Sequence, residues 1–123
     1  MELRLDARTS AVRVVRRQVA LWARRNGAKA DAQRTLTLLT SEIVTNAVEH
    51  GPSEGSITVH ARLQANGFRV AVTDEASDRP VVQPFEVGRL RGRGLQLVEL
   101  LSVDWGVDVD GGSGKSVWFV VAK

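Results

Sequence analysis

The segment from Leu36 to Gly51, LTLLTSEIVTNAVEHG, decides the fold, because it places polar residues beside a helical apolar stripe. The stripe consists of Leu36, Leu39, Ile43 and Ala47. At about 100° per residue, Glu42 and Asn46 lie roughly 40° apart on one side of that helix, next to the stripe. A carboxylate and an amide at the edge of a buried face cost free energy unless something there needs them. The segment therefore predicts a helix that carries a polar site beside the core.

Length and composition indicate one globular domain, residues 1–123. The chain is 43% hydrophobic and 25% charged, as soluble proteins are. It contains no cysteine, which excludes disulfides and thiolate metal sites. The sequence begins without a basic-then-apolar leader, and no apolar run approaches the roughly 20 residues of a membrane helix. We therefore expect a cytoplasmic protein with no membrane partner.

The formal net charge is +3, and most basic residues are arginines near the start of the chain. On a helix, one broad side would hold Arg13, Arg16, Arg17 and Arg24. The simpler interpretation is a solvated helix face, and the alternative is an acidic partner or a phosphate-bearing ligand. Aromatic residues make up 5% of the chain, too few to build stacking platforms for single strands. A nucleic-acid partner is therefore not expected.

Hydrophobic periodicity predicts a mixture of helices and strands. Helical spacing covers residues 9–26, 31–50 and 94–101. Apolar and polar residues alternate over residues 2–6, 57–63, 68–73, 103–109 and 116–120. Asn66-Gly67 is a strong hairpin signal, and hairpins imply a mixed, mainly antiparallel sheet. Three amphipathic helices would cover one face of this sheet, so the fold class is α+β, a two-layer α/β sandwich.

A long stretch between Asp74 and Arg93 shows no regular period. A structureless loop of this length is unusual in a compact domain and is usually functional or disordered. We expect a flexible lid at about residues 75–93.

Glu42 and Asn46 suit phosphoryl chemistry. An asparagine oxygen is a hard ligand for Mg²⁺, which keeps several waters and takes substrate phosphates as ligands. A carboxylate one turn earlier can take a proton from a hydroxyl nucleophile or from water. The alternative is that both residues border the solvent face of the helix. His50, by itself, is typical of a residue that packs near a helix C-terminus.

Two further features suit a nucleotide. Asp74 directly follows the predicted strand 68–73, where a carboxylate can accept a hydrogen bond from an exocyclic amine such as that of adenine. The alternative is an aspartate that starts a turn. Gly92-Arg93-Gly94 opens onto a helix, whose N-terminal N–H groups and dipole favour a phosphate.

Gly114-Lys115-Ser116 invites comparison with the P-loop, which the sequence does not support. Position 109 is a valine where that motif needs a glycine, and a strand follows instead of a helix. A hairpin turn explains the segment better, although Lys115 and Ser116 can still reach a phosphate from the strand end.

The order Glu42-x-x-x-Asn46, Asp74, Gly92-x-Gly94 and Ser116 resembles the GHKL ATPases, which include gyrase and the catalytic domains of histidine kinases. Within this family the single-domain bacterial anti-sigma factor serine kinases are the most similar. Residues 42–51, EIVTNAVEHG, look like their N box, and residues 92–98, GRGLQLV, look like their G2 box. The resemblance covers nearly the whole chain and implies a Bergerat-type fold that uses ATP and Mg²⁺.

The resemblance also implies roles for individual residues. Glu42 would be the general base, Asn46 the Mg²⁺ ligand, and Asp74 the residue that recognises adenine. Further contacts to the nucleotide would come from Thr45, His50, Gly92, Arg93, Gly94, Leu95 and Ser116.

Family members of this size bind a sigma factor, often as dimers, and phosphorylate a serine on a small antagonist protein. The resemblance therefore implies an ATP-binding anti-sigma factor with serine-protein kinase activity. The alternative is a regulatory module of the same fold that binds ATP or a partner without phosphotransfer. Ala76 and Asp78 motivate this alternative, because they stand where the family usually has the glycines of its first glycine box. Direct binding of nucleic acid and a sensor histidine kinase are weaker alternatives.

Overall fold

The predicted alternation of helices and strands is found in the computed structural model, which describes residues 1–50, 55–76, 93–110 and 114–123. The elements are β1 (Glu2–Asp6), α1 (Thr9–Arg25), α2 (Ala30–His50), β2 (Gly55–Gln64), β3 (Gly67–Ala76), α3 (Arg93–Leu101), β4 (Asp104–Asp110) and β5 (Gly114–Val121). Within these ranges, no helix is both long and apolar enough to cross a membrane.

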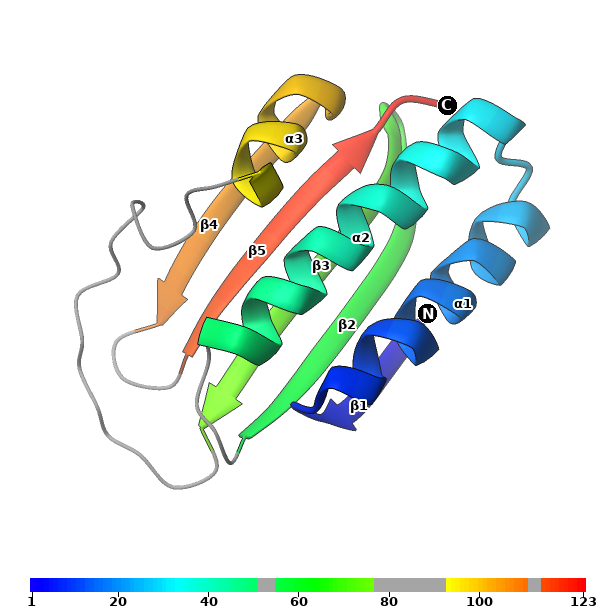
Figure 1. Cartoon of the computed structure of the whole chain (residues 1–123). Coiled ribbons are helices and arrows are strands. Elements are labelled where there is room, and N and C mark those ends of the chain that lie inside the picture. The colour runs from blue at the N-terminus through cyan, green and yellow to red at the C-terminus, as the bar shows by residue number, and fades with distance from the viewer. Residues whose placement is uncertain (51–54, 77–92, 111–113) are drawn as a thin grey trace.

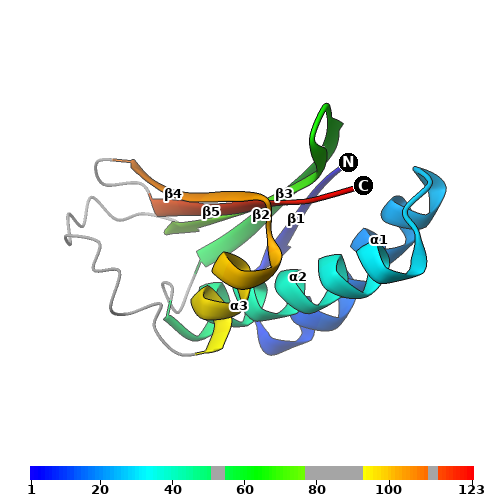
Figure 2. The same cartoon turned by 90° about the horizontal axis from the view of Figure 1, so that it is seen from above.

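The five strands form one sheet in the order β1-β2-β3-β5-β4, and each neighbouring pair is antiparallel. All three helices lie on the same face of this sheet, as Figure 2 shows, and α2 runs along the middle of that face between α1 and α3. The predicted α+β two-layer sandwich is therefore confirmed. The described strands pair only in antiparallel fashion, where the sequence had predicted a mixed, mainly antiparallel sheet.

The core lies between α2 and the sheet. Leu36, Leu39 and Ile43 of the predicted stripe are buried, at 0%, 0% and 4% exposure. They pack in the same hydrophobic cluster as Val59 and Val72, which point to this face because side chains alternate along a strand. Burial of each such side chain contributes about 1.5–3 kcal/mol. The amphipathic spacing of α2 therefore fixes which side of the helix faces the sheet and leaves Glu42 and Asn46 half-buried at its edge.

The arginine-rich side of α1 points away from this core. The side chains predicted to share one face are all exposed, namely Arg13, Arg16, Arg17 and Arg24. Their exposure is what a solvated helix face requires.

The boundaries of β3 correct one prediction. Asp74 was expected directly after a strand, but β3 continues to Ala76. It continues because Asp74 has a ladder partner on each side, Ile57 in β2 and Lys115 in β5. Asp74 therefore does not start a turn. Of the predicted lid, residues 75 and 76 belong to β3 and residue 93 to α3, whereas residues 77–92, with Asp78, lie outside the described residues.

The start of β5 supports a stability prediction. Gly114 has φ +131°, and a Cβ there would overlap the backbone carbonyl oxygen of Asp74. Because β3 must move to relieve that overlap, Gly114→Ala is expected to lower the free energy of unfolding by about 2–3 kcal/mol. Urea denaturation followed by circular dichroism measures this loss.

Gly27→Ala is the matched control for the backbone conformation alone. Gly27 has φ +83°, and a Cβ there would meet nothing within 4 Å. This control variant should lower the free energy of unfolding by only about 1 kcal/mol. Equal losses in the two variants would show that the overlap with Asp74 is not the cause.

Candidate functional site

A narrow cleft lies where α2 and α3 meet the strands β3 and β5. The space in it that water can occupy is about 10 Å³, roughly that of one molecule. The lining residues are Ile43, Asn46, Ala47, Val72, Asp74, Leu95, Val98, Lys115 and Val117. Three residues that the sequence singled out, Asn46, Asp74 and Leu95, thus meet in one cleft although they are far apart in the chain.

The first turn of α3 lies directly against the polar edge of α2. A Cβ placed on Gly94 would be 2.8 Å from Asn46 Nδ2 and 3.6 Å from Glu42 Cβ. A side chain at this position would displace the Asn46 amide, so the Gly92-x-Gly94 pattern has a packing reason at its second glycine. The structure therefore joins two predicted motifs, the α2 segment around Asn46 and the glycine pair before α3.

Asp74 supplies the one carboxylate among the described residues that line the cleft. It is 5% exposed and sits near the end of β3 between β2 and β5. The backbone N–H of Lys115 donates to Asp74 Oδ1 at 3.3 Å, and the Lys115 ammonium lies 3.4 Å from Asp74 Oδ2. A buried carboxylate requires such partners, because removal from water disfavours an unpaired charge.

Lys115 is a residue of this cleft that the sequence did not assign to the site. The sequence interpretation rejected a P-loop there and left Lys115 only as a residue that can reach a phosphate from the strand end. The one signal that reveals it is the strand register, in which Lys115 lies directly opposite Asp74. That register depends on how β5 pairs with β3, which cannot be read from the order of residues in β5 alone.

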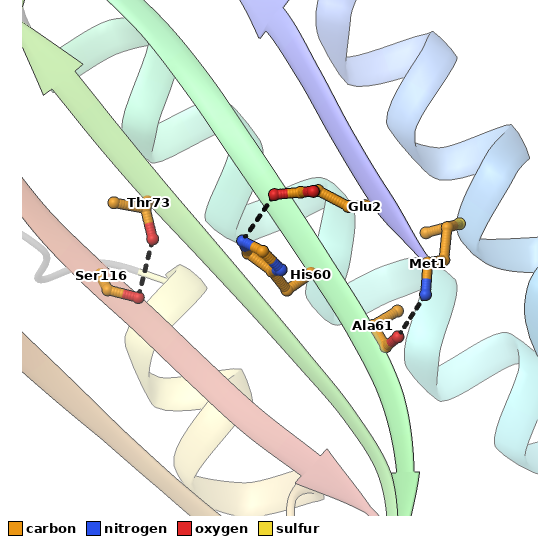
Figure 3. Close-up of polar contacts among 6 residues, drawn as sticks. All are labelled: Met1, Glu2, His60, Ala61, Thr73 and Ser116. Carbon is orange, nitrogen blue, oxygen red and sulfur yellow. Dashed lines mark hydrogen bonds and ion pairs between the residues drawn. The ribbon is translucent and has the colours of Figure 1, made fainter.

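Ser116, which the resemblance assigns to the nucleotide, does not line this cleft. It pairs with Thr73, whose hydroxyl donates to Ser116 Oγ at 3.1 Å. Figure 3 shows this hydrogen bond between β3 and β5, with His60 on β2 and Glu2 on β1. Successive side chains in a strand point to opposite faces, so Lys115 faces the cleft and Ser116 faces the side of the sheet without helices.

The remaining predicted residues are not among the described residues that line the cleft. Thr45 is half-buried on α2 but does not line the cleft. His50 is the last residue of α2 and Arg93 the first residue of α3. Gly92 lies outside the described residues.

The described lining of the cleft combines apolar walls with one buried carboxylate, which suits a flat, mostly apolar ring that carries an amino donor. The neighbouring Asn46, near the N-terminus of α3, suits a cation together with the anion that the cation accompanies. Among the described residues, no group of three or more His, Cys, Asp and Glu side chains could hold a metal on its own. A Mg²⁺ ion that takes most of its ligands from phosphates and water needs no such group.

Comparisons with known proteins find relatives over nearly the whole chain. The family described as histidine kinase-like ATPase domain matches residues 5–121. Serine-protein kinase RsbW of Listeria innocua is 31% identical over 117 residues, which cover 83% of this chain and 74% of the relative. RsbW of Listeria monocytogenes is likewise 31% identical with the same coverage.

Two solved structures have a similar fold. The RsbU and RsbW domains of a Mycobacterium tuberculosis protein give a TM-score of 0.69 at 25% identity, covering 99% of this chain and 32% of that one. A histidine kinase domain from Erythrobacter litoralis EL346 gives a TM-score of 0.52 at 18% identity, covering 90% and 60%, and supports the fold alone. The match spans residues 5–121 and the Listeria relatives align over most of both chains, so this chain belongs to the histidine kinase-like ATPase family.

Proposed function

We propose that this protein binds Mg²⁺-ATP in the cleft between α2, α3 and the sheet, and that it acts as an anti-sigma factor with serine-protein kinase activity. The observation that carries the proposal is the convergence of Asn46, Asp74 and Leu95 from three separate segments on one cleft. The 31% identity to serine-protein kinases over most of both chains supports the choice of reaction.

The base of the nucleotide would lie between the apolar walls of the cleft. Ile43 and Val98, both buried, belong to those walls, and Leu95 closes them from α3. Asp74 would accept a hydrogen bond from the exocyclic amine of adenine, because a carboxylate offers only acceptors. The phosphates would extend past Asn46 toward the start of α3, where backbone N–H groups and the helix dipole favour anions.

Asn46 would hold Mg²⁺ through its amide oxygen, with phosphate oxygens and water as the other ligands. When bound, this ion neutralises charge on the phosphates. Glu42 lies one turn before Asn46 on the same edge of α2. Glu42 would accept the proton of the substrate serine hydroxyl. The serine oxygen would bond to the γ-phosphorus as the bond from that phosphorus to ADP breaks.

The partners follow from the same proposal. The protein would act in the cytoplasm as a homodimer. It would bind a sigma factor and phosphorylate a serine of a small antagonist protein. Phosphorylation of the antagonist would leave the sigma factor bound and transcription from its promoters low.

Two measurements test the proposal. Calorimetric titration with Mg²⁺-ATP should show one site per chain, and incubation with radiolabelled ATP and the cognate antagonist should yield phosphoserine. Absence of any nucleotide binding would overturn the nucleotide site and with it the kinase activity.

A non-catalytic module of the same fold is the second candidate. The small space that water can occupy in the cleft, about 10 Å³, and the pairing of Asp74 with Lys115 favour it. Nucleotide binding without phosphoserine on the purified cognate antagonist would select this candidate, and phosphoserine would exclude it.

The contact between Gly94 and Asn46 leads to a prediction about Mg²⁺. In Gly94→Ala the new Cβ would displace the Asn46 amide, which is the free end of a side chain and moves cheaply. We therefore expect affinity for Mg²⁺-ATP to fall about tenfold while affinity for ATP in EDTA changes little, with stability reduced by less than about 1 kcal/mol. Calorimetry in the two buffers measures the difference.

Leu100→Ala is the control for this prediction, because Leu100 lies on the same helix and is 78% exposed. It should leave both affinities unchanged. An equal fall with and without Mg²⁺ in Gly94→Ala would remove Asn46 from the role of metal ligand.

A further inference from the structure

One residue, Lys115, occupies both oxygens of the Asp74 carboxylate. Its backbone N–H donates to Oδ1 at 3.3 Å, and its ammonium lies 3.4 Å from Oδ2. The backbone contact belongs to the β3–β5 ladder region and persists whatever side chain stands at position 115. The ammonium contact depends on the side chain and can be exchanged for another donor.

The ion pair lies inside the cleft. The side chains of Lys115 and Asp74 are 18% and 7% exposed, and both residues line the cavity. Charges withdrawn from water attract each other more strongly than exposed pairs and are screened less by salt. The Lys115 ammonium therefore competes with any other donor for the Asp74 carboxylate.

A nucleobase that donates to Asp74 Oδ2 competes with the Lys115 ammonium, which already lies 3.4 Å from that oxygen. Both side chains line a narrow cleft, so a ring that enters it comes close to the ion pair. An amino group that takes the place of the ammonium at Oδ2 breaks the ion pair, and its binding free energy is reduced by the contact that is lost. The backbone N–H at Oδ1 keeps the carboxylate oriented throughout.

We propose that Lys115 is an internal competitor for the base-recognising carboxylate, and that this competition sets the affinity for adenine nucleotides. This role rests on the proposed nucleotide site. It acts on the base and not on the phosphates, so it applies equally to adenosine and to ATP.

The test is calorimetric titration of Lys115→Met with adenosine and with Mg²⁺-ATP. Methionine keeps an unbranched apolar chain and removes the charge. We expect the Kd for both ligands to fall about tenfold relative to the wild type. Lys29→Met removes the same charge from the exposed segment between α1 and α2 and should change neither Kd.

A second variant guards against a folding defect, since Asp74 loses its charged partner in Lys115→Met. Lys115→Gln keeps a neutral donor, and its Kd should lie between those of the wild type and Lys115→Met. Circular dichroism establishes that each variant is folded. The double variant Asp74→Asn/Lys115→Met should bind no more tightly than Asp74→Asn alone, because the gain from Lys115→Met acts through the carboxylate.

The outcomes separate this role from the nucleotide site itself. If the wild type binds and both Lys115 variants bind equally or more weakly, the competitor role is wrong and the nucleotide site stands. Weaker ATP binding with unchanged adenosine binding would instead assign Lys115 to the phosphates and also overturn the role. If neither the wild type nor any variant binds either ligand, the nucleotide site fails and the role fails with it.

Discussion

Glu42→Gln is expected to lower the rate of serine phosphorylation by at least about 100-fold while the Kd for Mg²⁺-ATP stays within about threefold of the wild-type value. Glutamine keeps the shape of the side chain at the half-buried edge of α2 but accepts no proton there. General-base catalysis contributes about 10²–10⁴-fold to a rate, so the loss should appear in the chemical step. Single-turnover transfer of radiolabelled phosphate to the cognate antagonist measures that step.

Glu99→Gln is the matched control, since Glu99 lies on α3 and is exposed. It should retain the wild-type rate. A Glu42→Gln rate within tenfold of wild type would remove Glu42 from the role of base. A parallel rise in the Kd for ATP would point to a binding role instead.

Asp74→Asn is expected to weaken the binding of both adenosine and Mg²⁺-ATP by about 10- to 100-fold. The carboxylate would be replaced by an amide that offers one acceptor and brings two donors toward the amino group of adenine. A hydrogen bond to a charged group contributes about 1.5–3 kcal/mol, which corresponds to this range of affinity. Calorimetric titration with each ligand provides the measurement.

Asp108→Asn makes the same chemical change on the opposite face of the sheet. Asp108 pairs with Ser116 in the β4–β5 ladder and is exposed, so this control should bind both ligands as the wild type does. Urea denaturation of both variants accounts for any loss of stability. Unchanged binding in Asp74→Asn would sink the nucleotide site.

Much of the fold could be predicted from the sequence, because its apolar residues recur with either the spacing of a helix or the alternation of a strand. The spacing of Leu36, Leu39 and Ile43 placed α2 against the sheet, and the alternation around Val59 and Val72 placed these residues in the core. These patterns reflect burial of apolar surface, which is the dominant favourable term in folding. The edge position of Glu42 and Asn46 follows from the same pattern and a fixed helical angle.

The site was less predictable, because it depends on how strands pair. Lys115 and Ser116 are neighbours in sequence, yet a shift of one residue sends a side chain to the other face of a sheet. The resemblance to a family pointed to Ser116, whereas the register places Lys115 opposite Asp74. The extension of β3 past Asp74 likewise depends on ladder partners from β2 and β5, which the local sequence of β3 does not contain.

The strands β3 and β5 carry two adjacent cross-strand contacts that point in opposite directions. Asp74 and Lys115 meet on the side with the helices, and Thr73 and Ser116, one residue along each strand, meet on the bare side. These contacts lie on opposite faces of the same pair of strands, so only the backbone of the sheet separates them. A protein that pulled β3 and β5 apart from the bare side would loosen the carboxylate on the other side, without ever touching the nucleotide.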